Sequence, residues 1–285
     1  MQTTETDYKF SLLVPTWNNL DLLKLCVRSI RQNSFHKIQL IVVVNEGKDG
    51  TLEWVKTQPD LDYVHAVKNI GICYGLNSTR SLIKAEYIVY LNDDMYVLPN
   101  WDLELSNEIE KIGSKAFMVS GTLIEPTDTG NPCVVVKDYG RNVEDFKEAL
   151  LLKEYKNLAV TDWSGSTWPP NVMHIDMWDL VGGYSIEFSP GMYSDPDLSR
   201  KLFEAGVRTF IGKGSSLVYH FGSKSTKRIK RNNGRKTFIL KWGITSKTFT
   251  KQFLKLGKSA NSTIEKPELS FLSKLINKLK RIKSC

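Results

Sequence analysis

Two hydrophobic patterns alternate along the first hundred residues. Uninterrupted runs of β-branched and aromatic residues, typical of strands buried on both faces of a sheet, occupy residues 10–14, 38–44, 62–67 and 87–91. Apolar residues at helical spacing fill the segments between them, at 20–31, 51–57 and 75–84. Pro15 is expected to end the first strand. Because helices connect successive strands, the pattern predicts an α/β fold with a mostly parallel sheet flanked by helices.

The second half of the chain is less regular. It predicts helices at 101–112, near 143–153, from 177 and at 197–206, and strands at 117–124, 209–211 and 217–220. Residues 163–170, rich in Trp, Ser and Gly, are expected to form a loop. Residues 222–260 are expected to be partly mobile, with a helical stretch at 235–242. Residues 269–282 predict an amphipathic helix with one apolar face, made of Leu272, Leu275, Ile276, Leu279 and Ile282.

Charge is distributed unevenly along the 285 residues. The net charge is +8, yet residues 222–285 hold 18 Lys and Arg against two acids, and the remaining residues hold 21 against 29. A basic tail on an acidic body indicates phosphates, anionic lipid or nucleic acid as neighbours, or a merely solvated tail. No nucleic-acid-binding motif is present, so no nucleic-acid partner is expected.

Features tied to cellular location favour the cytoplasm. The polar, acidic N-terminus does not resemble a signal peptide, and no apolar run approaches the roughly 20 residues that span a bilayer. Four scattered cysteines lack metal-type spacing and suggest reduced thiols. We therefore expect a cytoplasmic location, either free or peripheral on the inner face of a membrane.

Polar residues follow the predicted strand at 87–91 directly: Asn92, Asp93 and Asp94. Ligands of open α/β sheets bind at the carboxyl ends of strands. Adjacent carboxylates there repel each other unless a cation lies between them, which favours a divalent metal held for a phosphate-bearing ligand. The alternative is a helix N-cap after the strand, because Asp and Asn are preferred caps. This segment alone leaves both interpretations open.

Six motifs follow one another along the chain. They are S-L-L-V-P-T-W-N at 11–18, V-V-N-E-G-K-D-G-T at 43–51, N-I-G at 69–71 with G-L-N at 75–77, L-N-D-D at 91–94, G-G-Y at 182–184 with D-P-D-L at 195–198, and V-Y-H at 218–220. In this order they resemble the family 2 glycosyltransferases of the GT-A fold, over about residues 8–223. Two departures stand out: Asn45-Glu46 replaces a frequent carboxylate pair, and Asn92 replaces the first Asp of the metal motif.

The resemblance implies inverting transfer of a sugar from a nucleoside diphosphate sugar to the hydroxyl of a saccharide or lipid-linked acceptor. It divides the chain into a GT-A domain at 1–222, with a nucleotide-sugar half at about 8–100 and an acceptor half at about 101–222, and a basic C-terminal extension at 223–285. It also implies Mn²⁺ or Mg²⁺ bound by Asp94 and His220, because a cation neutralises the diphosphate leaving group. One imidazole ligand favours Mn²⁺.

Nucleotide-sugar contacts are implied for residues near strand ends: Pro15, Thr16, Asn18, Asn45, Glu46, Asn69, Asn77, Asn92 and Asp93. Asn residues in such loops are also frequent turn formers, and a loop cap explains Asp93 equally well. Acceptor contacts are implied for Trp163, Trp168, Tyr193 and Asp197. Aromatic rings stack on sugars, but most aromatic residues belong to cores.

Asp195 is the candidate general base for the acceptor hydroxyl. Pro196 should keep it extended, outside a helix that Asp197 caps. The alternative is that both acids serve as caps. The family often has an acid before the base, where this chain has Ser194.

The basic tail has three interpretations. Its amphipathic helix lies on an anionic membrane, which suits a lipid-linked acceptor; Lys224, Lys227 and Arg228 close over the diphosphate as a lid; or the helix packs onto a partner. Two other functions compete with glycosyl transfer: a metal-dependent nucleotidyltransferase and a nucleic-acid-binding protein. The loop at 15–19 lacks the glycine expected of a nucleotidyltransferase.

Overall fold

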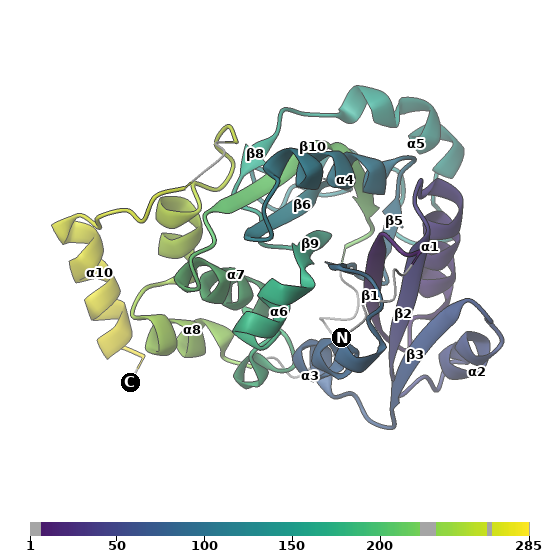
Figure 1. Cartoon of the computed structure of the whole chain (residues 1–285), viewed down its shortest axis with the longest axis horizontal. Coiled ribbons are helices and arrows are strands. Elements are labelled where there is room, and N and C mark those ends of the chain that lie inside the picture. Colours follow the sequence, from purple (N-terminus) through teal and green to yellow (C-terminus); the bar gives the residue numbers. More distant parts are fainter. Residues whose placement is uncertain (1–6, 223–231, 261–263, 285) are drawn as a thin grey trace.

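One mixed sheet with helices on both faces forms the body of the protein (Figure 1). The structure is a computed structural model that describes residues 7–222, 232–260 and 264–284. Its strands are β1 (Phe10–Trp17), β2 (Ile38–Asn45), β3 (Leu61–Ala66), β4 (Tyr87–Tyr90), β5 (Met95–Val97), β6 (Phe117–Glu125), β7 (Val134–Val136), β8 (Trp163–Ser164), β9 (Asn171–His174) and β10 (Thr209–His220). Their order is β3-β2-β1-β4-β9-β6-β10-β5, with β7 beside β6 and β8 beside β10.

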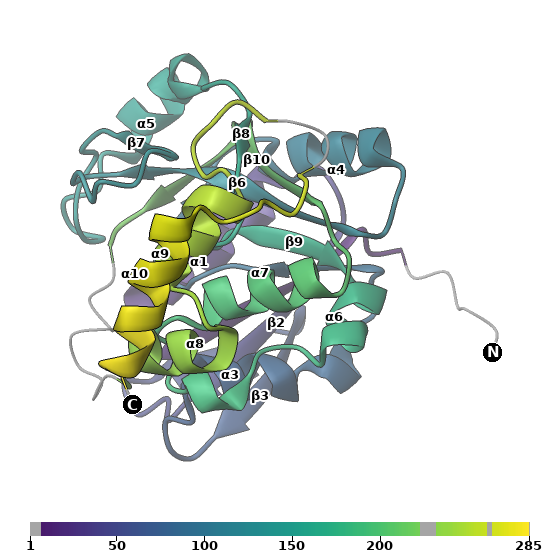
Figure 2. The ribbon, with the colours of Figure 1, turned by 90° about the vertical axis from the view of Figure 1, so that its left-hand side faces the viewer.

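Helices cover both faces of this sheet (Figure 2). They are α1 (Leu20–Asn33), α2 (Thr51–Lys56), α3 (Gly71–Ser78), α4 (Trp101–Ile112), α5 (Glu148–Glu154), α6 (Ile175–Val181), α7 (Ser194–Glu204), α8 (Gly234–Trp242), α9 (Ser246–Thr248) and α10 (Phe271–Ile282). A π-helical turn at Phe249–Phe253 follows α9 directly. The predicted α/β class with flanking helices is therefore confirmed.

The parallel part of the sheet agrees with the prediction. Strands β3, β2, β1 and β4 pair in parallel, as do β6 and β10. The patterns did not predict β9, which runs antiparallel between β4 and β6, or the three-residue β5, which runs antiparallel to β10. Both strands are too short to show a period of their own.

Strand β1 continues through Pro15 instead of ending there. The Leu13 carbonyl accepts a hydrogen bond from Leu91 on the β4 side, and β4 pairs with β1 only as far as Leu13. Two residues further on, the nitrogen of Pro15 points to the same side, where no strand follows. Proline is tolerated there because no ladder hydrogen bond is missing.

The two strands predicted at 209–211 and 217–220 are one strand, β10. Its register against β6 shifts between Lys213 and Leu217, which is a β-bulge. A Cβ atom on Gly214 within the bulge would lie 1.8 Å from the Val160 carbonyl oxygen, so only glycine fits. The small residues of the bulge conceal the continuity of the strand in the sequence.

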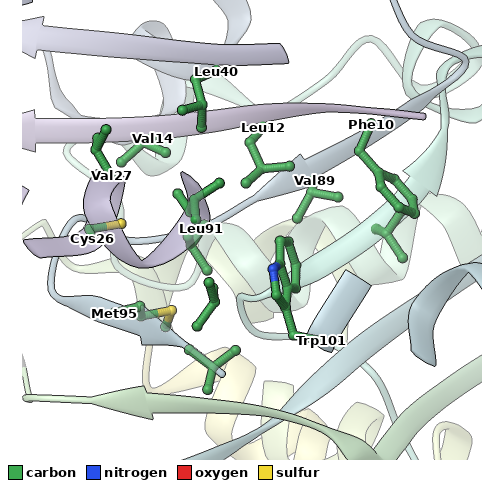
Figure 3. Close-up of a cluster of buried hydrophobic side chains, with 14 of the residues drawn as sticks. Phe10, Leu12, Val14, Cys26, Val27, Leu40, Val89, Leu91, Met95 and Trp101 are labelled. Atoms are coloured by element: carbon green, nitrogen blue, oxygen red, sulfur yellow. The ribbon is translucent and has the colours of Figure 1, made fainter. Parts of the chain in front are cut away.

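Two large hydrophobic clusters lie on opposite faces of the sheet. Leu12, Val14 and Val89 point toward Trp101 and helix α1 in the first cluster (Figure 3). The second cluster packs under α3, α6 and α7. It also takes side chains from the C-terminal part of the chain: Phe238, Ile244, Phe249, Phe253, Leu254 and Ile264.

This packing corrects the expectation of a partly mobile segment at 222–260. Residues 234–254 contribute side chains to the second cluster, whereas the apolar side chains of α10 are exposed. The proposed lid residues Lys224, Lys227 and Arg228 lie outside the described residues. No helix in the described segments is long and apolar enough to cross a membrane.

Candidate active site

The Asn92–Asp94 segment lies between β4 and β5, at the carboxyl edge of the sheet. Asp93 and Asp94 are 7% and 6% exposed, so both carboxylates are nearly buried. Because β10 pairs antiparallel with β5, His220 lies opposite Met95, the residue after Asp94. The sheet therefore brings His220 close to Asp94, although the two residues are 126 positions apart in the sequence.

His220 is held between two carboxylates. Its Nδ1 lies 2.7 Å from Oε1 of Glu125, and its Nε2 lies 3.3 Å from Oδ1 of Asp94. Burial lowers the pKa of His220, but the two carboxylates outweigh burial and raise that pKa to about 10. Proteins often orient a metal-binding histidine by letting one ring nitrogen donate to a carboxylate, as Nδ1 of His220 can to Glu125.

These residues fit a divalent cation that is shared with a ligand. Nε2 of His220 is buried and makes no aligned hydrogen bond, although it faces Asp94. Within the described segments, no three His, Cys, Asp or Glu side chains gather as a metal site. Asp94 and His220 are a pair of candidate protein ligands. Mg²⁺ and Mn²⁺ are often bound in this way, with phosphate oxygens and water completing the shell.

The loops after β1 and β2 meet through Asn18 and Glu46. Nδ2 of Asn18 donates to Oε2 of Glu46 over 3.1 Å, and Oδ1 of Asn18 accepts from the Lys48 amide. Hydrogen bonds from Trp17 and Asn18 hold the pKa of Glu46 below its usual value. Both Asn18 and Glu46 have left-handed backbones, with φ of 47° and 60°. Such conformations are uncommon for residues other than glycine and cluster at binding sites.

Asn45, the last residue of β2, links the end of β1 to the segment before α3. Its Oδ1 accepts from the Ile70 amide over 3.0 Å, and its Nδ2 donates to the Thr16 carbonyl over 3.4 Å. Asn69 accepts from the Gly71 amide, which shapes the start of α3. The buried Oγ1 of Thr16 has no hydrogen-bond partner. Pro15 and Thr16 belong to the last three residues of β1, next to this edge of the sheet.

Asp195 lies in the first turn of α7. Oη of Tyr184 donates to its Oδ1 over 3.3 Å. Burial raises the pKa of Asp195 to about 7, against the opposing effect of the Tyr184 hydrogen bond. A carboxylate with such a pKa is matched to accept a proton near neutral pH.

The expected roles of Pro196 and Asp197 are corrected. Helix α7 begins at Ser194, so Pro196 occupies its first turn, where proline is tolerated, and Asp197 is not the cap. Asp197 is fully buried; it accepts from Nε1 of Trp242 over 2.8 Å and pairs with Lys241 at 2.9 Å. It joins α7 to α8.

Tyr90, at the end of β4, lies between the two acidic motifs. Its ring packs edge-on against Tyr184 with 5.9 Å between centroids, and Tyr184 in turn bonds Asp195. Burial raises the pKa of the Tyr90 hydroxyl well above its usual range, and the charges of Asp195 and of the Asp93–Asp94 pair add to the rise. The three carboxylates thus share one electrostatic region around Tyr90.

A match to a family model assigns the chain to a protein family. The model described as "Glycosyl transferase family 2" matches residues 11–154, half of the chain. The chain belongs to glycosyl transferase family 2. The match includes the Asn92–Asp94 segment and ends before Asp195 and His220.

A curated relative supports the assignment to family 2. It is the "Putative colanic acid biosynthesis glycosyl transferase WcaA" of Escherichia coli (strain K12), which is 28% identical over 98 residues. The matched region is 32% of this chain and 34% of the relative, so the chain spans about a third of that protein.

Solved structures share the fold of this family 2 chain. S. aureus TarS 1–349 has a TM-score of 0.55 and 14% identity over 74% of this chain and 60% of its own. GalNAc-T7 with UDP, GalNAc and Mn²⁺ has a TM-score of 0.58 and 12% identity over 81% and 48%. The mannosyltransferase PcManGT from Pyrobaculum calidifontis, in complex with GDP-Man and Mn²⁺, has a TM-score of 0.52 and 18% identity over 84% and 62%. The GT-A fold predicted from the sequence is confirmed.

The residues expected on the acceptor side of this family 2 protein divide into two groups. Tyr193 precedes α7 and is partly exposed beside Asp195, and Trp168 is also partly exposed. Trp163 is buried in β8, where its Nε1 donates to Thr122 over 2.9 Å. Only the first group presents a ring surface.

Asn77 lies on α3 rather than in a strand-end loop. Its Nδ2 donates to the Tyr184 carbonyl over 2.7 Å, and its Oδ1 accepts from the Tyr184 amide over 2.8 Å. Asn77 therefore fixes the loop that carries Tyr184.

Sequence reasoning missed two residues of the site. Glu125 ends β6 one position after the predicted strand, and an acid at that sheet edge was an available signal. Tyr184 belongs to the G-G-Y motif, but nothing in the sequence shows that its hydroxyl reaches Asp195 eleven residues later.

Proposed function

We propose that this protein is an inverting glycosyltransferase that moves a sugar from a nucleoside diphosphate sugar to an acceptor hydroxyl. The observation that carries the proposal is that Asp195 bonds Tyr184, whose ring packs against Tyr90 at the end of the strand that leads to Asp93 and Asp94. The proposal supposes that a phosphate-bound cation at Asp94 acts together with Asp195, whose pKa of about 7 suits a base. Transfer to a hydroxyl needs both groups.

Asp195 is the proposed base. It takes the proton of the acceptor hydroxyl while the acceptor oxygen bonds to the anomeric carbon. The bond from that carbon to the diphosphate breaks, and the diphosphate leaves with the electron pair. Because base and leaving group act on opposite faces of the sugar, the anomeric configuration inverts.

The donor is assigned to the loops of the first hundred residues. Glu46, kept ionised by its low pKa, is placed to accept hydrogen bonds from ribose or base, and Asn18 orients it. Thr16 offers an unpartnered hydroxyl beside them. Asn45 and Asn69 shape the loops, and Asn92 and Asp93 adjoin the diphosphate. We assign residues 8–100 to the donor and 101–222 to the acceptor.

Asp94 and His220 are the proposed protein ligands of Mn²⁺ or Mg²⁺. When bound, the cation neutralises charge on the departing diphosphate. The structures of GalNAc-T7 and PcManGT, whose descriptions include Mn²⁺ with UDP and with GDP-Man, support this assignment. The imidazole of His220 favours Mn²⁺.

The proposed acceptor is a saccharide, free or lipid-linked, with Tyr193 and Trp168 as candidate stacking surfaces. The colanic acid role in the name of the E. coli relative supports a place in polysaccharide synthesis.

Donor binding gives the direct test. Thermal stabilisation of the full chain is measured with a panel of UDP-, GDP-, dTDP- and CMP-linked sugars, each with and without Mn²⁺. We expect one nucleotide class to raise the melting temperature only when Mn²⁺ or Mg²⁺ is present. If no sugar nucleotide stabilises the protein with either cation, the proposal is wrong.

A further inference from the structure

Helix α10 docks on the protein through its polar side. It lies across α8 and α9 on the outside of the molecule (Figure 2). Its one buried residue is Asn277, whose Oδ1 accepts from the Thr245 amide over 2.8 Å and from Oγ1 of Thr248 over 3.1 Å. One turn earlier, Oγ of Ser273 accepts from Nε2 of Gln252 over 3.0 Å. Hydrogen bonds therefore fix which side of α10 faces the body.

The apolar side of α10 faces away from the protein. The exposed fractions are Phe271 82%, Leu272 63%, Leu275 40%, Ile276 40%, Leu279 51% and Ile282 62%. At 100° per residue these six side chains form one stripe, and Asn277 lies opposite its centre. A surface helix of a globular protein normally turns such a stripe toward the core. A contiguous exposed apolar stripe marks an interaction site.

The charges beside this stripe are all positive. Residues 271–284 include Lys274, Lys278, Lys280, Arg281 and Lys283, and no acid. Lysine is depleted in the cores of protein–protein interfaces, and α10 has a single aromatic residue, so the composition does not fit a protein partner. Apolar side chains flanked by lysines fit the surface of an anionic bilayer, where acyl chains lie beneath phosphates.

We propose that the α10 stripe is a docking site for an anionic lipid bilayer. The six apolar side chains enter the boundary between headgroups and acyl chains, and the lysines within and next to the stripe, Lys278, Lys280 and Lys283, contact lipid phosphates. The helix lies in the plane of the membrane, which brings the whole length of the stripe to the boundary between headgroups and acyl chains. This docking does not depend on the transfer reaction.

The part of the protein that carries α10 adjoins the acceptor half of the proposed active site. Helix α10 packs on α8. The segment that leads into α8 touches the chain before Asp195: Nδ2 of Asn232 donates to the Met192 carbonyl over 3.3 Å, and a Cβ on Gly234 would lie 2.0 Å from that oxygen. If the proposed function holds, a docked bilayer presents a lipid-linked acceptor from this side.

Vesicle sedimentation tests the docking. The full chain is mixed with phosphatidylcholine vesicles that contain either no anionic lipid or about 30% phosphatidylglycerol. The test variant is Leu272→Gln/Leu275→Gln/Leu279→Gln, which keeps good helix formers. The matched control is Leu150→Gln/Val160→Gln/Leu180→Gln, which removes apolar side chains of similar exposure from other surfaces. Circular dichroism and melting temperature verify that both variants are folded.

We expect wild type and control to sediment with anionic vesicles and to bind neutral vesicles at least roughly tenfold less. The test variant should lose binding by about tenfold or more, with an unchanged melting temperature because its side chains are exposed. Lys278→Gln/Lys283→Gln should reduce binding to anionic vesicles only. Three results would overturn the proposal: no binding to anionic vesicles at low salt, equal binding by the test variant, or a dimer in light scattering that the test variant dissociates.

Discussion

Oη of Tyr184 donates a hydrogen bond to Oδ1 of Asp195 over 3.3 Å. The Tyr184 ring is held in place by edge-on packing against two other rings. Its centroid lies 5.8 Å from that of Trp178 and 5.9 Å from that of Tyr90. Burial raises the pKa of Asp195 to about 7, and the hydrogen bond opposes that rise by stabilising the ionised form. Tyr184 is therefore a positioning residue that sets both the orientation and the basicity of the proposed base.

Tyr184→Phe should move the pH dependence of transfer. In the wild type, kcat/KM should rise with pH through a pKa of about 7, because only the carboxylate accepts a proton. Loss of the hydroxyl should raise that pKa by about one unit, given that a hydrogen bond to a charged group contributes about 1.5 kcal/mol. Activity at pH 6 should then fall roughly tenfold, while activity at pH 9 stays within about twofold.

The control for this variant is Tyr63→Phe, which removes a hydroxyl from a half-exposed residue on β3. Its pH profile should overlay that of the wild type. An equal loss at every pH in Tyr184→Phe would mean that Tyr184 only supports the fold.

Asp195→Asn should abolish transfer and stabilise the fold at neutral pH. The folded-state pKa of about 7 lies above the ordinary value of 3.8, so the folded protein binds this proton more tightly than the unfolded chain. Wild-type stability should therefore fall as pH rises from about 4 to 7. The variant does not lose stability in this way. Above pH 7 its free energy of unfolding should exceed that of the wild type by at most about 4 kcal/mol, and by less because solvent screens the partly exposed carboxylate. Urea unfolding at pH 5 and pH 8 measures the difference.

Transfer by Asp195→Asn should drop by about 10²–10⁴-fold, with donor binding nearly unchanged. A stability advantage of the same size at pH 5 and pH 8 would contradict the raised pKa. Wild-type turnover in the variant would remove Asp195 as the base.

Local patterns were sufficient for the parallel half of the fold. Strands such as Tyr87–Tyr90 are buried on both faces and carry a continuous apolar signal, and Trp101–Ile112 has a clear helical period. The sequence could not reveal β9, because four residues have no periodicity and their place between β4 and β6 depends on long-range pairing. The core role of Phe238 and Phe249 was also hidden, since surrounding lysines suggested a solvated tail.

The candidate site divides in the same way. Asp94, His220 and Asp195 were predicted from motifs at strand and helix ends; the structure brings Asp94 and His220 together and puts Asp195 in the first turn of α7. The partners that tune them, Glu125 and Tyr184, come from other elements and are defined only by tertiary packing.

Glu125→Gln should weaken the use of the cation. Glu125 holds Nδ1 of His220 at 2.7 Å, which fixes the ring so that Nε2 faces Asp94. Removing a carboxylate that orients a metal-binding histidine typically costs 10–100-fold in metal affinity. Mn²⁺-dependent binding of the stabilising sugar nucleotide, measured by calorimetry, should lose affinity in this range. The exposed Glu86→Gln is the control. Unchanged Mn²⁺ dependence would argue against His220 as a ligand.

Asp197→Ala should destabilise the protein without changing the acceptor KM of the molecules that remain folded. The carboxylate is fully buried, accepts from Trp242 and pairs with Lys241, so its loss leaves the part-buried indole donor of Trp242 without a partner. Such a loss costs about 2–3 kcal/mol. Urea unfolding measures this loss of stability. Asp195→Asn at the same pH is the comparison, because it should increase the free energy of unfolding. A raised acceptor KM with unchanged stability would instead return Asp197 to the acceptor site, where the sequence first placed it.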